Sequence, residues 1–390
     1  MVDVLPETRS VPLAWRNLVA SKRRLVRSVA GIGFAVLLML VQLGFERGFF
    51  DASLGMVRQL DGELFVLRAT KYRFGSEDPF PAADLDGARN FATVASVVPL
   101  YATWQRLFWK DPKGSNVYVV QAFGFDPDRP PFLIPEVRQQ SDKLKTDNTV
   151  LVDRRARPFL NMGGDARDTE INGKAVQIVG SFALGPDFMS NGTVMMSAGT
   201  FAALLVGNAG AAGSLPVEFG VVKLRPGSDV AAVQRELHAT LPPEVHVMTK
   251  PELVAFERDF QADLSSAGPI FWMGTLVGFV VGMLISYQII YTDLSDQLPQ
   301  YATLKGMGYS TGYLVRVVFQ QAALAAVAAY VPAWLLCLIV YQVIGEFALL
   351  PLRMTLPQTA LSFALTLGMC LVSAALAVRR VVSLDPAEVF

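Results

Sequence analysis

The sequence predicts an α+β membrane protein with four transmembrane helices, one before and three after a large mixed α/β domain. The 390 residues are 52% hydrophobic and only 17% charged, whereas soluble chains contain about 25% charged residues. Four segments are also apolar over the roughly 20 residues that a helix needs to cross about 30 Å of hydrocarbon. A membrane-embedded part and a separate globular domain are therefore expected.

The first apolar segment is expected to remain in the protein as a span. A polar, basic stretch precedes it, and no small-residue cleavage pattern follows it, so it does not resemble a signal peptide. The third segment contains Pro332, which should kink it, and the amides of Gln320 and Gln321, which are more typical of helix–helix contacts than of transport chemistry. The four predicted spans are residues 29–45, 269–291, 313–345 and 357–378.

Basic residues set the expected orientation. Lys and Arg residues precede span one, and Arg379 and Arg380 follow span four, whereas the segment before span two is acidic. Because four spans place both ends of the chain on one side, we expect both termini in the cytoplasm and the domain outside it. This predicts a multi-pass protein of a bacterial inner membrane.

The segment before span one combines an apolar stripe, which includes Trp15, with a basic stripe formed by Arg16, Arg23, Arg24 and Arg27. A helix of this kind can lie in the membrane interface, with its basic face toward anionic headgroups. An ordinary basic flank on the cytoplasmic side of a span explains the same residues equally well. Both interpretations stay open.

Residues 46–268 are predicted to form the external domain. Asn172 and Gly173 lie between two strand-like flanks and predict a hairpin. Helical stretches over 49–60 and 252–265 lead out of span one and into span two, so we expect two helical stalks to carry the domain. The predicted strands are 62–67, 116–125, 149–153, 177–182, 193–197, 217–224 and 245–249, and the predicted helices between them are 82–91, 198–206 and 229–241.

The sequence contains no catalytic constellation. It lacks GxSxG and HExxH motifs. Its two histidines are too few for a histidine-based metal cluster, and both Cys337 and Cys370 lie in apolar runs. The formal net charge of +0 gives no reason to expect a nucleic acid partner. We therefore expect no enzyme activity, cofactor or metal in this chain.

The short loop between spans two and three carries a candidate docking helix. Pro299 can open a helix there, and Gly306 with Gly308 can close it. Such a helix across the inner surface fits the part of a transporter permease that docks into its ATPase, and the alternative is a plain connecting helix. The candidate coupling residues are Pro299, Gln300, Tyr301, Ala302, Thr303, Leu304, Lys305, Gly306, Met307 and Gly308, of which Tyr301, Leu304 and Met307 recur on one face.

This stretch resembles the motif of FtsX/MacB-type permeases, E-[YF]-[AG]-[TI]-L-[KR]-A-[MLI]-G, and is most similar to the DevC branch of ABC exporter permeases. Gln300 stands where the family usually has Glu, and Gly306 stands where it often has Ala. Segments at 13–18, 29–35, 40–45 and 151–157 are similar to the same branch. The end of the chain resembles the family's cytoplasmic tail, with Asp385, Pro386 and Ala387 as its characteristic residues.

The resemblance implies a homodimeric permease subunit with a MacB-like periplasmic domain and a separate ABC ATPase. That partner would bind ATP and Mg, and the sequence itself has no GxxxxGK[ST] phosphate loop. The resemblance further implies mechanotransmission, in which ATP-driven closure of the ATPase moves the periplasmic domains. A membrane-fusion adaptor and a TolC-like outer-membrane channel are implied as partners, and a lipid, glycolipid or other amphiphile as cargo.

Two alternatives share this topology. One is a lipoprotein-releasing permease, and the other is an FtsX-like activator of a periplasmic hydrolase, for which the external domain is large. The expected parts of the chain are a cytoplasmic amphipathic helix (1–28), span one (29–45), a periplasmic domain with helical stalks (46–268), span two (269–291), a cytoplasmic coupling loop (292–312), span three (313–345), a short periplasmic loop (346–356), span four (357–378) and a cytoplasmic tail (379–390).

Overall fold

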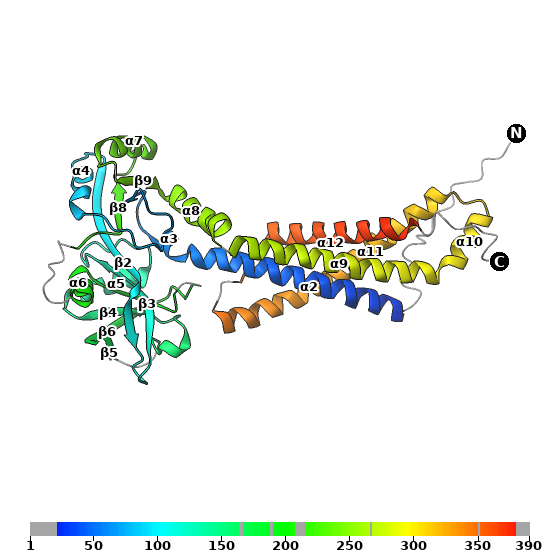
Figure 1. Ribbon diagram of the computed structural model, residues 1–390, viewed down its shortest axis with the longest axis horizontal. Helices are drawn as coiled ribbons and strands as arrows, with labels where there is room; N and C mark the ends of the chain where they lie inside the picture. Colours follow the sequence, from blue (N-terminus) through cyan, green and yellow to red (C-terminus); the bar gives the residue numbers. More distant parts are fainter. Residues whose placement is uncertain are drawn as a thin grey trace. The chain divides into compact units, whose positions relative to one another are not determined.

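The computed structural model describes residues 22–163, 167–187, 190–206, 215–265, 267–349 and 352–379. The chain divides into two compact units (Figure 1). We call them the helical unit, built mainly from residues before 48 and after 268, and the sheet unit, built mainly from residues 48–268. The expected amphipathic residues Trp15 and Arg16, and the tail residues Asp385, Pro386 and Ala387, lie outside the described residues.

Within the described ranges, four helices are long and apolar enough to cross a membrane. The first, α2, begins at Lys22, so Arg23 and Arg27 belong to the helix that carries span one. The last residues of α2, from Gly48 onward, belong to the sheet unit. The four helices are α2 (Lys22–Ser53), α9 (Ala267–Asp296), α11 (Thr311–Ala348) and α12 (Leu356–Ala377), and the short α10 (Leu298–Gly306) lies between α9 and α11 in the chain.

The interior of the helical unit is apolar, and several of its polar side chains form hydrogen bonds across helices. The Tyr341 hydroxyl of α11 donates to the Leu40 carbonyl of α2 and accepts from Gln358 Nε2 of α12. Tyr330 of α11 shares a hydrogen bond with Ser362 of α12, with 2.8 Å between the hydroxyl oxygens. Such bonds hold membrane helices together because lipid offers no alternative partners.

The described part of the sheet unit contains one nine-stranded sheet in the order β3-β7-β4-β6-β5-β2-β8-β1-β9. The long strand β2 joins its two halves, because residues 94–100 pair with β8 and residues 101–110 pair with β3. The strands are β1 (Leu64–Arg68), β2 (Val94–Lys110), β3 (Val117–Phe125), β4 (Thr149–Asp153), β5 (Asp168–Ile171), β6 (Lys174–Phe182), β7 (Thr193–Ser197), β8 (Phe219–Leu224) and β9 (Val245–Thr249).

Helices cover both faces of this sheet. One buried cluster includes Phe201 of α6 and Leu237 of α7, and a second includes Val57 of α3, Val137 of α5 and Leu253 of α8. Burial on both faces explains why β4 is hydrophobic without alternation. The helices are α3 (Gly55–Gln59), α4 (Asp86–Arg89), α5 (Pro135–Gln140), α6 (Ala198–Val206), α7 (Val230–Thr240) and α8 (Lys250–Asp259).

The arrangement confirms the predicted fold class, a mixed α/β domain between one apolar helix and three. The predicted hairpin is also confirmed, since Asn172 (φ 51°) and Gly173 (φ 74°) form the turn between β5 and β6. The sequence analysis missed β2 and found β5 only as the first flank of this hairpin, since it did not give β5 a range of its own. The predicted helix over 252–265 is wrong in detail, because α8 ends at Asp259 and a π-helical turn follows over Phe260–Leu264.

Candidate functional site

The ten candidate coupling residues form a single compact element, α10 and the turn after it. Pro299 lies in the first turn, where the helix does not require the backbone N–H that proline lacks. The N–H groups of Gln300 and Tyr301 both donate to the Gln297 carbonyl, at 3.0 and 3.1 Å. At the other end, Gly308 adopts a φ of 93°, a left-handed conformation that ends the helix.

The side chains of α10 face two environments. Tyr301 is 2% exposed and packs against the bases of α9, α11 and α12, and Ala302 beside it is also buried. Leu304 is half-buried against the same cluster, whereas Met307 is 64% exposed. The predicted face of Tyr301, Leu304 and Met307 therefore runs from buried to exposed. Tyr301 anchors the helix, and Met307 is available to a partner.

A cavity of about 290 Å³ lies between α10 and the beginning of α11. We call it the coupling groove. The sequence analysis did not assign Leu314 and Val317, which α11 contributes to it. The sequence signal that could have identified them is their position just after the Gly308 turn, because that turn brings the beginning of α11 back toward α10. The coupling groove is lined by Gln300, Tyr301, Thr303, Leu304, Met307, Leu314 and Val317.

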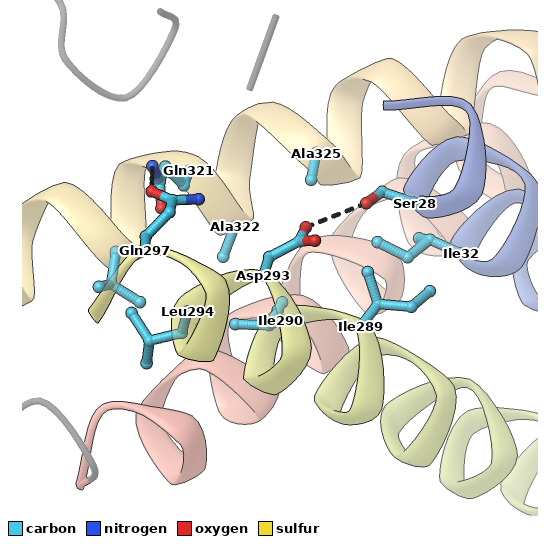
Figure 2. Close-up of a pocket in the computed structure, with 11 residues that line it drawn as sticks. Ser28, Ile32, Ile289, Ile290, Asp293, Leu294, Gln297, Gln321, Ala322 and Ala325 are labelled. Atoms are coloured by element: carbon cyan, nitrogen blue, oxygen red, sulfur yellow. Dashed lines mark hydrogen bonds between the residues drawn. The ribbon is translucent and has the colours of Figure 1, made fainter. Parts of the chain in front are cut away.

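Polar side chains from α2, α9, α11 and the α9–α10 junction line a common space at the bases of these helices (Figure 2). Ser28 Oγ of α2 donates to Asp293 Oδ2 of α9 at 3.2 Å. Gln321 Nε2 of α11 donates to Gln297 Oε1 at 3.3 Å, and the Tyr301 hydroxyl donates to Gln321 Oε1 at 3.3 Å. A cavity of about 30 Å³ between these groups is large enough for water. Among these residues, sequence reasoning had singled out only Tyr301 and Gln321.

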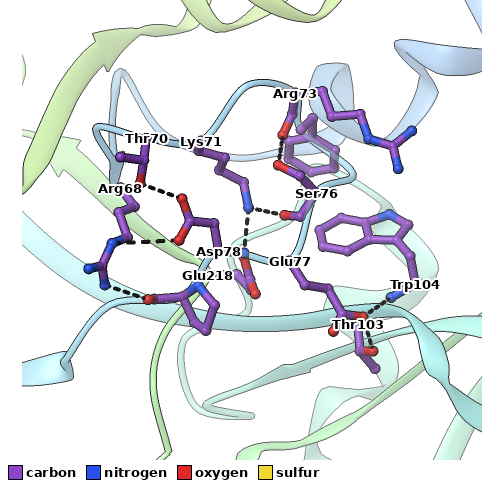
Figure 3. Close-up of polar contacts among 12 residues, drawn as sticks. Arg68, Thr70, Lys71, Arg73, Ser76, Glu77, Asp78, Thr103, Trp104 and Glu218 are labelled. Atoms are coloured by element: carbon purple, nitrogen blue, oxygen red, sulfur yellow. Dashed lines mark hydrogen bonds and ion pairs between the residues drawn. The ribbon is translucent and has the colours of Figure 1, made fainter.

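The loop between β1 and α4 is held to the sheet by a buried ion pair (Figure 3). Lys71 Nζ lies 2.6 Å from Glu218 Oε2 and also donates to the Ser76 carbonyl. Its ammonium group lies over the Phe219 ring, 4.7 Å from the centroid, and near Trp104. The side chains of the ion pair are 0% and 4% exposed. No local pattern predicted this pair, since its members lie 147 residues apart in the chain.

The same loop is attached to the segment expected to form the second stalk. The Phe74 N–H donates to Glu257 Oε2 of α8 at 2.6 Å, and Gln261 Nε2 of the π-helical turn donates to Oε1 at 2.8 Å. The Arg73 guanidinium lies 5.6 Å from the centroid of the Phe260 ring. Burial raises the pKa of the Glu257 carboxyl, although the neighbouring Arg73 opposes this effect. These contacts fix the loop to α8 through the Glu257 carboxyl, whose protonation depends on pH.

The two histidines of the chain lie side by side. His238 of α7 and His246 of β9 are exposed, and their ring centroids are 5.0 Å apart. Burial and the neighbouring His238 lower the pKa of His246. Across the ranges that the structure describes, no three His, Cys, Asp or Glu side chains gather as metal ligands.

Two family matches cover most of the chain. Residues 26–240 match the MacB-like periplasmic core domain, and residues 270–386 match the FtsX-like permease C-terminal region. No curated protein sequence matches the chain.

Similar solved structures include the periplasmic region of MacB from Actinobacillus actinomycetemcomitans, which is 11% identical with a TM-score of 0.34, over 50% of this chain and 92% of that one. The extracellular domain of the ABC-type transporter YknZ from Gram-positive bacteria is 12% identical with a TM-score of 0.33, over 48% of this chain and 99% of that one.

The first family match alone covers more than half of the chain, and the second covers the three apolar helices after the sheet unit. FtsX-like permeases are transport components of the inner membrane that generally work with an ABC ATPase. The chain therefore belongs to the FtsX/MacB family and is a membrane-embedded permease subunit of the ABC type.

Proposed function

We propose that this chain is the permease subunit of an ATP-driven exporter and that α10 docks into a separate ABC ATPase on the cytoplasmic side. The observation that carries the proposal is the coupling groove. It presents an apolar recess next to the exposed Met307, at a helix that Tyr301 anchors to the bundle. A partner side chain that fills an apolar pocket of this kind contributes strongly to binding.

The work of the exporter is mechanotransmission by a homodimer. The continuity of α2 supports this proposal, because one unbroken helix of 32 residues runs from the helical unit into the sheet unit. A straight helix of this length spans about 48 Å at about 1.5 Å per residue. Displacement at its base is therefore carried along its axis rather than absorbed by a flexible linker.

The DevC branch is the proposed place of this chain within the family. Partners of that branch are a membrane-fusion adaptor and a TolC-like outer-membrane channel, and the proposed cargo is a lipid, glycolipid or other amphiphile. The similarity of the 300–308 segment to that branch supports this assignment. The uncharged amide of Gln300 is exposed on α10, so docking depends on the apolar recess rather than on an ion pair at this position.

Co-purification with the ABC ATPase that we expect to be encoded beside this chain tests the proposal. Met307→Asp places a charge at the edge of the coupling groove, and Met307→Leu is the matched control that keeps an apolar side chain. We expect Met307→Asp to weaken the complex by about 30-fold, the effect of losing an interface residue that contributes about 2 kcal/mol. Met307→Leu should bind as the wild type does. Leu304→Asp is less informative, since Leu304 also packs against the bundle.

A second control places the same charge elsewhere on the helical unit. Leu356 is 86% exposed at the beginning of α12. It follows the end of α11, whereas α10 precedes the beginning of α11. Leu356→Asp should leave the complex intact. If wild type holds no ATPase, or if Met307→Asp binds as tightly as Met307→Leu, α10 is a plain connecting helix and the proposal is wrong.

A further inference from the structure

We propose that Ser28, Asp293, Gln297, Gln321 and Tyr301 form a polar relay that transmits movement of α10 to α2. The inference rests on the proposed function, because it assumes that an ATPase moves α10. The five side chains come from α2, α9, the α9–α10 junction, α11 and α10, and hydrogen bonds join them in two groups. Figure 2 shows four of them, Ser28, Asp293, Gln297 and Gln321. All five are therefore positioning residues between the coupling groove and the helix that enters the sheet unit.

The first group joins α9 to α2. Asp293 accepts from Ser28 Oγ at 3.2 Å and lies 3.4 Å from Arg27 Nη2. Ser28 is buried although it lies near the start of a long helix. A buried hydroxyl bound to a carboxylate is strongly held, since hydrogen bonds to charged groups contribute more than neutral ones. The beginning of α2 therefore follows Asp293.

The second group joins α10 to α11 and to the end of α9. Tyr301 donates to Gln321, and Gln321 donates to Gln297, whose backbone carbonyl accepts the first N–H groups of α10. Any shift of α10 thus moves Gln297 through both its side chain and its main chain.

The end of α9 connects the two groups. Asp293 and Gln297 are four residues apart, so they lie on neighbouring turns of the same side of the chain. Both residues line the small cavity between the groups, together with Ser28 and Gln321. Movement at Gln297 therefore reaches Asp293 within about one helical turn, about 5.4 Å.

The polar character of the relay matters because apolar side chains can slide past one another, whereas a buried hydrogen bond holds a defined geometry. Breaking one leaves an unsatisfied group and costs free energy. The surrounding cluster of Ile290, Leu294, Leu314 and Val318 is apolar and has no such directionality. The relay therefore fixes α10 to α2 at defined hydrogen bonds within an otherwise apolar interface.

The chain offers a matched control for this inference. Gln320 is exposed and Gln321 lies in the relay, so the same substitution can be made at neighbouring positions of α11. Gln321→Leu removes the side-chain hydrogen bonds that join α10 and Gln297 to α11 and leaves the main-chain bonds at Gln297, whereas Gln320→Leu removes neither. Ser28→Ala is a second, smaller change that removes only the hydroxyl between α2 and Asp293, and it decides the matter if Gln321→Leu fails to fold.

The test measures hydrogen exchange over residues 48–60 in the complex of the full-length chain with its ATPase, with and without ATP and vanadate. The quantity of interest is the ratio of exchange rates between the two conditions. Substitutions that interrupt coupling between distant sites change it by a factor of about 2 to 30. We expect Gln321→Leu and Ser28→Ala to reduce the ratio by that amount, while Gln320→Leu keeps the wild-type ratio and all variants hold the ATPase.

The outcomes separate the relay from the proposed function. If Gln321→Leu and Ser28→Ala hold the ATPase and respond to nucleotide as Gln320→Leu does, the relay is wrong and the docking role stands. A wild-type complex whose residues 48–60 do not respond to nucleotide also refutes the relay. If the wild type does not hold the ATPase, the proposed function fails and the relay fails with it.

Discussion

The buried ion pair of the sheet unit provides a sharp test of the structure. Lys71→Met removes the ammonium group from the Glu218 carboxylate, which is 4% exposed and keeps a hydrogen bond from the Asp78 N–H of the loop at 3.3 Å. Removing one member of a buried ion pair costs about 3 to 5 kcal/mol, because the other charge stays desolvated without compensation. In a domain of this size, each kcal/mol lowers the melting temperature by about 2 to 4 °C. We therefore expect a decrease of about 6 to 20 °C.

A double variant tests the cause of this loss. Burial lowers the pKa of Lys71 and raises the pKa of Glu218, so desolvation outweighs the attraction between the two groups. The intact pair then contributes little net stability, and a neutral replacement of both members should be tolerated. Lys71→Met combined with Glu218→Gln should recover more than half of the loss that Lys71→Met causes alone.

The assay is thermal unfolding of the full-length chain in detergent, followed by tryptophan fluorescence. Trp104 is a suitable reporter, because Lys71 Nζ lies 5.6 Å from its ring centroid. The matched control is Lys223→Met, which breaks the exposed ion pair with Asp61; the Lys223 side chain is 46% exposed. Exposed pairs contribute about 0 to 1 kcal/mol. If Lys71→Met shifts the melting temperature no more than Lys223→Met, the argument from burial is wrong.

Two further predictions concern the same unit. Because burial raises the pKa of Glu257 above its ordinary 4.5, the folded state binds its proton more tightly, and stability falls as pH rises from about 4.5 through the raised pKa. Glu257→Gln should flatten the melting temperature between pH 5 and pH 8, and an unchanged slope would contradict this cause. Asp229 caps α7 by accepting from the N–H groups of Ala231 and Ala232; Asp229→Ala should cost about 1 kcal/mol in thermal unfolding, and Asp229→Asn should cost much less.

Local signals in the sequence predicted much of the fold. Apolar length predicted the four long helices, because a helix in lipid must satisfy its own backbone hydrogen bonds. The Asn172–Gly173 turn predicted its hairpin, since both residues tolerate a positive φ. Pro299 and Gly308 predicted the α10 helix, because proline fits the first turn of a helix and a glycine with positive φ can end one. In each case the physical cause acts within a few neighbouring residues.

The strand β2 was missed because its hydrophobic pattern depends on what covers it. In β2, Pro99 and the charged Arg106 interrupt the run, and both sheet faces are partly buried, so no clear alternation remains. The strand β5 has only four residues, and the first three are polar, so its own pattern is weak and the hairpin turn was the signal for it. Pairing with β3 and β8 makes β2 a strand, and pairing with β2 and β6 makes β5 one. The pairing of β2 with its neighbours is not a local property of its sequence.

The candidate site divides in the same way. The sequence by itself determined that residues 299–308 form a short helix between two spans, and the motif in it indicated the family. Only the tertiary structure decided that Tyr301 is buried and Met307 is exposed, and that Leu314 and Val317 complete the groove. It alone brought Ser28 to Asp293, 265 residues away in the chain. Helix formation follows from nearby residues, whereas burial and hydrogen bonding between helices depend on how the whole bundle packs.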